Sequence, residues 1–110
     1  MPYTQDVFCF IETRLFTRLV AEYLSDDDYT TLQSTLIRNP EAGTVVPGSG
    51  GIRKLRWAGQ GRGKQGGYRV IYYLRRTEGQ IWMLTIYPKN VTDTIPSQML
   101  RRIREELENA

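Results

Sequence analysis

Hydrophobic residues switch between strand-like and helical spacing along this chain, and the switches outline its first half. The apolar run at 6–11, DVFCFI, is rich in residues that favour strands and predicts a first strand. From about 12–24 the apolar positions recur every three or four residues, which predicts an amphipathic helix. A second helix is expected to start after Ser25, a good N-cap, and to end at Asn39-Pro40. So short a connection predicts an antiparallel helical hairpin.

The second half is dominated by short strands separated by glycine-containing turns. Strands are expected at 52–57 (IRKLRW), 68–74 (YRVIYYL) and 80–87 (QIWMLTIY), followed by a helix at 96–109. A chain of 110 residues has room for one hydrophobic core, so a single domain over 1–110 is expected. The fold class predicted is α+β, with a mostly antiparallel sheet packed on the helical hairpin and a short C-terminal helix.

Alternation along the strands predicts which side chains face the helices. On the last strand it places Trp82, Leu84 and Ile86 together, and we expect the helical hairpin to cover that face. Trp57 and Tyr72 are also expected to point inward. The open face is then expected to gather Lys54, Arg56, Arg69 and Tyr87.

Charge is concentrated in the middle of the chain, although the net charge of +3 is modest. The segment 52–76 holds eight of the fifteen basic residues and no acidic residue. These eight are Arg53, Lys54, Arg56, Arg62, Lys64, Arg69, Arg75 and Arg76. Aromatic residues lie among them, a mixture that stacks bases and neutralises phosphates. Nucleic acid is therefore the first partner to consider.

Several other functions lack the residues they need. The chain has no histidine and one cysteine, Cys9, so neither a zinc site nor a histidine-based catalytic group is expected, and no cofactor is predicted. The run at 61–66 matches G-x-G-x-x-G, but a strand follows it where a dinucleotide site needs a helix. Asp26, Asp27 and Asp28 suit a helix N-terminus better than a metal. Without a signal-like or membrane-length apolar run, a cytoplasmic location is expected.

The order of elements, together with the segments GGIRKLRW, GYRVIYYL and TIYPKN, resembles the RelE/ParE superfamily, and specifically its HigB-like branch. That resemblance implies the toxin of a type II toxin–antitoxin module. Such toxins are metal-independent endoribonucleases that cut mRNA in the ribosomal A site, inhibit translation and arrest growth. The implied chemistry is attack of an RNA 2′-hydroxyl on the adjacent phosphate. The implied partners are the ribosome, its mRNA and a HigA-like antitoxin with a helix-turn-helix.

The resemblance also assigns roles to residues. Its catalytic set falls on Arg69, Lys54, Lys89 and Tyr87. Residues implied in RNA or ribosome binding are Arg53, Arg56, Arg62, Lys64, Tyr68, Arg75 and Arg76. Some relatives carry a catalytic tyrosine near the start of the C-terminal helix, and this chain has none between 90 and 106. Which of Lys54, Lys89 and Tyr87 moves the proton is left open.

Two other functions remain possible from the sequence. One is a ParE-like poison of DNA gyrase that cuts no RNA; the retained cations Lys54, Arg69 and Lys89 favour the ribonuclease over it. The other is a single-stranded RNA-binding domain without catalysis. The three differ in what happens to mRNA on translating ribosomes.

Overall fold

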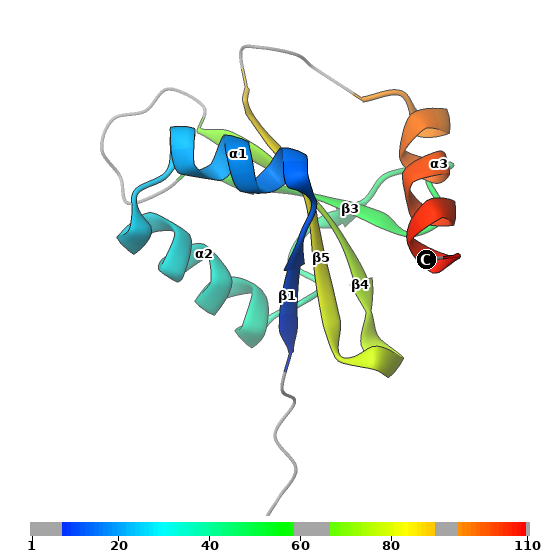
Figure 1. Ribbon diagram of the computed structural model, residues 1–110, viewed down its shortest axis with the longest axis horizontal. Helices are drawn as coiled ribbons and strands as arrows, with labels where there is room; N and C mark the ends of the chain where they lie inside the picture. Colours follow the sequence, from blue (N-terminus) through cyan, green and yellow to red (C-terminus); the bar gives the residue numbers. More distant parts are fainter. Residues whose placement is uncertain (1–7, 59–66, 90–94, 110) are drawn as a thin grey trace, which may run out of the picture.

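A computed structural model describes residues 8–58, 67–89 and 95–109. Over these residues the chain forms a five-stranded mixed sheet with three α-helices, which confirms the α+β class (Figure 1). In chain order the elements are β1 (Cys9–Glu12), α1 (Arg14–Tyr23), α2 (Asp26–Arg38), β2 (Thr44–Val45), β3 (Ile52–Trp57), β4 (Tyr68–Arg75), the 3₁₀ turn η1 (Arg76–Glu78), β5 (Gln80–Pro88) and α3 (Ser97–Glu108).

The sheet has the order β1-β5-β4-β3-β2. The strands β2 to β5 pair antiparallel, whereas β1 lies parallel to β5 at the edge. The sheet is therefore mostly antiparallel, as expected. Its other edge is β2, two residues that pair only with Arg53 and Lys54 of β3.

Side-chain caps fix the two N-terminal helices close to where the sequence predicts them. Thr13 Oγ1 accepts a hydrogen bond from the Phe16 amide at 3.0 Å and caps α1, and Ser25 Oγ accepts from the Asp28 amide at 3.1 Å and caps α2. The α2 helix ends before Asn39, as expected. The three aspartates occupy its first turn, where the helix dipole favours negative charge.

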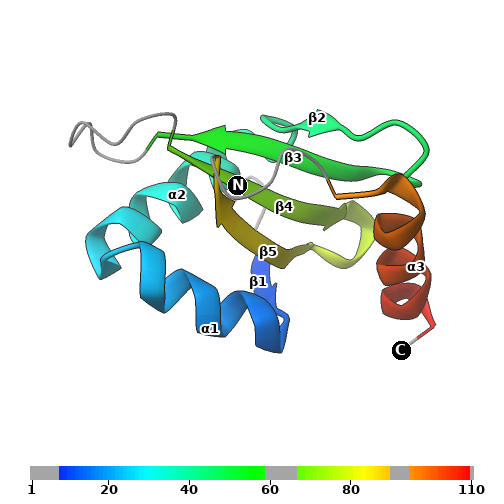
Figure 2. The same ribbon diagram turned by 90° about the horizontal axis from the view of Figure 1, so that it is seen from above.

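Helices cover the two faces of the sheet unequally. The hairpin of α1 and α2 covers one face (Figure 2). Its Phe16, Leu32 and Leu36 pack there against strand residues that include Val70 and Tyr72. On the other face α3 buries Leu100 in a smaller cluster with Ile52, Ile71, Tyr73, Leu84 and Tyr87. We call these the hairpin face and the α3 face. Tyr72 and Trp57 lie on the hairpin face, which confirms that they point inward.

The predicted face is wrong for Trp82 and Leu84 of β5 and is confirmed for Ile86. Trp82 and Leu84 lie on the α3 face, whereas Ile81, Met83 and Ile86 pack under the hairpin. The register explains the difference: Ile71 pairs with Thr85 but Tyr72 pairs with Met83, so β5 carries a bulge at Leu84. The extra residue reverses the alternation beyond it, and Ile86 therefore points away from the side that Trp82 faces.

Candidate nucleic-acid interface

Three strands bring cationic side chains together on the α3 face. Arg69 in the middle strand β4 pairs with Arg56 of β3 on one side and with Tyr87 of β5 on the other. Residues directly opposite each other in a sheet share a face, and Lys54 lies two positions before Arg56 and so shares it too. The predicted grouping of these four residues is therefore confirmed. We call Lys54, Arg56 and Arg69 the cationic face.

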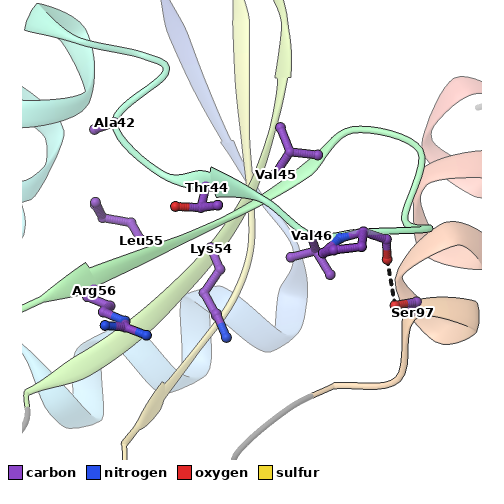
Figure 3. Close-up of a pocket in the computed structure, with 9 residues that line it drawn as sticks. Ala42, Thr44, Val45, Val46, Lys54, Leu55, Arg56 and Ser97 are labelled. Carbon is purple, nitrogen blue, oxygen red and sulfur yellow. Dashed lines mark hydrogen bonds between the residues drawn. The ribbon is translucent and has the colours of Figure 1, made fainter.

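The α3 helix leaves this part of the sheet open. It packs over the opposite end of β3, against Ile52, while Lys54 and Arg56 lie further along the strand, beyond its cover (Figure 3). Lys54 and Arg69 are half-buried, and Arg56 is exposed. The cationic face thus combines solvent access with side chains held by the sheet backbone.

Two of the three cations of this face, Lys54 and Arg56, take part in no ion pair found among the described residues. The ion pairs found in the described part of the chain join Arg76 to Glu41 at 2.9 Å and Arg104 to Glu108 at 3.4 Å, and neither involves Lys54 or Arg56. Arg69 Nη1 lies 3.4 Å from the carbonyl oxygen of Tyr68, its donor directed at a neutral acceptor. Clustered like charges repel one another, so binding of a polyanion would relieve an existing electrostatic cost.

Tyr87 and Lys89 lie at the same end of the sheet as Arg69. The Tyr87 side chain is 7% exposed, in the cluster beneath α3. Lys89 has an exposed side chain, and its amide donates to the carbonyl of Gly67 at 3.1 Å, one residue before β4 begins. That bond ties the end of β5 to the start of β4. Three residues of the predicted catalytic set, Lys54, Arg69 and Tyr87, therefore come from the adjoining strands β3, β4 and β5, and Lys89 directly follows β5.

A groove of about 690 Å³ adjoins the cationic face (Figure 3). It lies between β3, the start of α3 and the residues 42–47, which contain β2 and are called the β2 segment. Lys54, Arg56, Thr44 and Ser97 supply its polar lining, and Val46 and Pro47 are among the aliphatic residues. None of the described residues that line it is acidic. Ser97 Oγ donates to the Pro47 carbonyl at 2.7 Å and so joins α3 to the β2 segment. Neither Thr44 nor Ser97 was predicted as a site residue. Thr44 lies in the glycine- and proline-containing stretch before β3, and Ser97 lies at the start of the helix predicted at 96–109, outside any charged run.

The structure separates several of the predicted RNA-binding residues from the cationic face. Arg53 pairs with Tyr72 and points to the hairpin face, where its Nη1 donates to the Gly43 carbonyl at 2.7 Å. Tyr68 also lies on the hairpin face, and its ring centre is 5.4 Å from that of Tyr23. Alternation along a strand explains both positions, because Arg53 directly precedes Lys54, Tyr68 directly precedes Arg69, and adjacent residues face opposite sides of a sheet.

The remaining predicted binding residues lie elsewhere or outside the description. Arg75 shares the side of Arg69 but stands at the far end of β4, six residues away. Arg76 is engaged by Glu41. Arg62 and Lys64 lie outside the described residues. Two cations from the predicted binding set and catalytic set, Arg56 and Lys54, therefore border the groove.

The described residues place no group of three or more histidine, cysteine, aspartate or glutamate side chains where they could hold a metal ion. Nor does any helix in that part of the chain have the length and apolarity to cross a membrane. No known protein-family model matches the chain. The cationic face and the groove supply cations and hydroxyl groups, a combination suited to an anionic ligand.

Proposed function

We propose that this chain is a RelE/HigB-like toxin, a metal-independent endoribonuclease that cuts mRNA on the ribosome. The observation that carries the proposal is the row Arg56, Arg69 and Tyr87 across three strands, with Lys54 beside it. An RNA phosphate placed on this row meets guanidinium groups from two strands. The helical hairpin behind the sheet and the C-terminal helix beside the row are consistent with a RelE-like fold.

The reaction class that fits is transesterification within the RNA. The 2′-hydroxyl loses its proton and attacks the adjacent phosphorus, and the bond to the 5′-oxygen of the next nucleotide breaks. The 5′-oxygen takes up a proton, so the products are a 2′,3′-cyclic phosphate and a 5′-hydroxyl. The pentacovalent intermediate carries an additional negative charge, which Arg69 and Arg56 stabilise. A preorganised donor of this kind contributes roughly 10²–10³ in rate.

Proton transfer falls to Lys54, Lys89 or Tyr87. Lys54 is half-buried on the cationic face, two residues before Arg56 and so beside the proposed position of the phosphate. Tyr87 has a hydroxyl but is buried, and Lys89 is exposed at the end of β5. The three differ in access, and their alanine or phenylalanine variants would separate them.

The partners proposed are the ribosomal A site with its mRNA, in the cytoplasm, and a HigA-like helix-turn-helix antitoxin. A ribosome supplies an extended polyanion for the basic residues of the central segment, and it orders the mRNA over the cationic face. The antitoxin would neutralise a protein whose expression alone arrests growth.

The test is to add the purified protein to translating ribosomes in the presence of EDTA and to map the new mRNA 5′ ends. The expected result is cleavage within A-site codons, with 2′,3′-cyclic phosphate and 5′-hydroxyl termini. Intact mRNA under these conditions would contradict the proposal. Parallel assays of gyrase inhibition and of RNA binding without cleavage would then identify the ParE-like or the non-catalytic alternative.

A further inference from the structure

The groove beside the cationic face shares Lys54 and Arg56 with the proposed cleavage site, whereas its other lining residues have no part in the chemistry derived above. Thr44 of β2 pairs directly with Lys54, which pairs in turn with Ile71 of β4, so the groove and the Arg56–Arg69 pair lie on the same side of adjoining strands. Strands are about 4.8 Å apart, and the distance from β4 to β2 is therefore about 10 Å. A phosphate on Arg69 would place its own nucleotide within reach of the groove.

The lining of the groove fits a nucleobase better than a second phosphate. Val46 and Pro47 are aliphatic lining residues that can pack against a flat ring. Val46 lies between Lys54 on one side and Ser97 on the other (Figure 3). The groove's volume of about 690 Å³ has room for a purine with its ribose. The polar groups are a lysine, an arginine and two hydroxyls, of which the Ser97 hydroxyl already donates to Pro47.

These groups discriminate among bases by their donors. Lys54 and Arg56 can only donate hydrogen bonds, and among the described residues that line the groove none is a carboxylate that could accept one. Guanine presents two acceptors, N7 and O6, on one edge, whereas adenine presents a donor, N6, beside its N7. In the position of guanine O6, adenine would place its N6 amino donor against the donors of Lys54 and Arg56, and no hydrogen bond would form there. The Thr44 hydroxyl can accept a bond as well as donate one, and so can meet the N–H groups of guanine.

We propose that this groove is a guanine subsite that holds the nucleotide beside the phosphate to be cut. The proposal rests on the proposed function for its place in a cleavage reaction, but the binding of guanine itself does not require cleavage. A correct bidentate contact discriminates by roughly tenfold or more against the wrong base. Thr44 adds to this preference from outside the cationic face.

The experiment is an NMR titration of the ¹⁵N-labelled protein with GMP, AMP and ribose 5-phosphate. GMP is expected to shift the amide signals of Thr44 and Val46 and to bind at least about tenfold more tightly than the other two. In Thr44→Phe the ring would occupy the groove, and the affinity for GMP should fall about tenfold or more. Thr30→Phe, a matched substitution on the exposed surface of α2, should leave that affinity unchanged.

The other outcomes are decisive as well. Equal affinity for GMP and AMP, or for GMP and ribose 5-phosphate, would overturn the guanine subsite, as would unchanged GMP affinity in a folded Thr44→Phe. If Thr44→Phe unfolds, Thr44→Val removes only the hydroxyl and should lower GMP affinity several-fold, and an unaltered value would contradict the proposal. GMP binding without any cleavage of mRNA would remove the proposed function and leave the subsite standing. Cleavage of mRNA without preference for guanine would remove the subsite and leave the proposed function standing.

Discussion

Replacing Tyr72 by phenylalanine should destabilise the protein strongly, although it removes a single oxygen atom. Tyr72 has no exposed surface, and its hydroxyl donates to the Pro40 carbonyl at 2.7 Å and accepts from the Gly43 amide at 2.9 Å. Gly43 is itself buried, and a Cβ there would lie 2.9 Å from the Tyr72 ring. The hydroxyl therefore holds the chain that leads from α2 into β2.

The magnitude follows from the two bonds. In Tyr72→Phe the buried amide of Gly43 loses its partner, which costs about 1–3 kcal/mol, and the bond to Pro40 contributes about 1 kcal/mol more. The expected loss is thus about 2–4 kcal/mol. A domain of this size has a free energy of unfolding of roughly 5–15 kcal/mol, so the loss is a substantial fraction of it. The midpoint of thermal unfolding should fall by roughly 8 °C or more.

Urea unfolding followed by circular dichroism measures this difference directly. Tyr23→Phe is the matched control, because it removes a tyrosine hydroxyl while its half-buried ring keeps the contact with Tyr68, and it should change the free energy of unfolding by less than about 0.5 kcal/mol. A Tyr72→Phe protein as stable as the parent would refute the account of how β2, and with it the groove, is held.

Three further predictions concern stability. Burial raises the pKa of Tyr29 and Tyr72, and burial together with the bond to Glu108 raises the pKa of Tyr73. Because the folded state holds these protons more tightly than the unfolded state, the stabilisation is complete below about pH 10 and is lost as pH rises further. The urea midpoint should therefore fall between about pH 9 and 11, and a constant midpoint would contradict this. Gly67→Ala should lower the free energy of unfolding by about 2 kcal/mol or more, since Gly67 has φ of 61° and an added Cβ would clash with the Trp57 carbonyl oxygen. A variant that unfolds thermally at the parental midpoint would show that this clash does not occur. Thr13→Ala should lower the free energy of unfolding, measured with urea, by about 1–2 kcal/mol, because Thr13 caps α1 and its hydroxyl donates to the Leu84 carbonyl at 2.8 Å. The control Thr17→Ala leaves the cap intact and should lower it by less.

Local signals in the sequence were sufficient for most of the elements. The cap at Ser25 and the Asn39-Pro40 stop bound α2, and β3 has the predicted limits of 52–57, because each of these signals acts through residues a few positions away. The two-residue strand β2 was missed. It lies in a stretch rich in glycine and proline, and two residues are too few to show a period of two.

The cationic face was predictable and its surroundings were not. Lys54, Arg56 and Arg69 lie on regular strands, where alternation alone places them together. The bulge at Leu84 depends on contacts across the chain: Thr13, 71 residues away, binds the Leu84 carbonyl through its hydroxyl and the Met83 carbonyl through its amide. No local pattern records such a contact, so Trp82 was assigned to the wrong face. The groove likewise depends on a contact between distant segments, the hydrogen bond from the Ser97 hydroxyl of α3 to the carbonyl of Pro47, two residues after β2.

The central claim is that the cationic face cuts RNA, and the single-turnover rate of Arg69→Ala on ribosome-bound mRNA tests it most directly. Charge in the intermediate develops at one phosphate, so loss of Arg69 should lower the rate by about 10² or more. Binding, spread over many cations, should weaken only slightly. Arg18→Ala removes an exposed cation from α1, behind the sheet, and should cleave at the parental rate. A folded Arg69→Ala protein that cleaves as fast as Arg18→Ala would contradict the account.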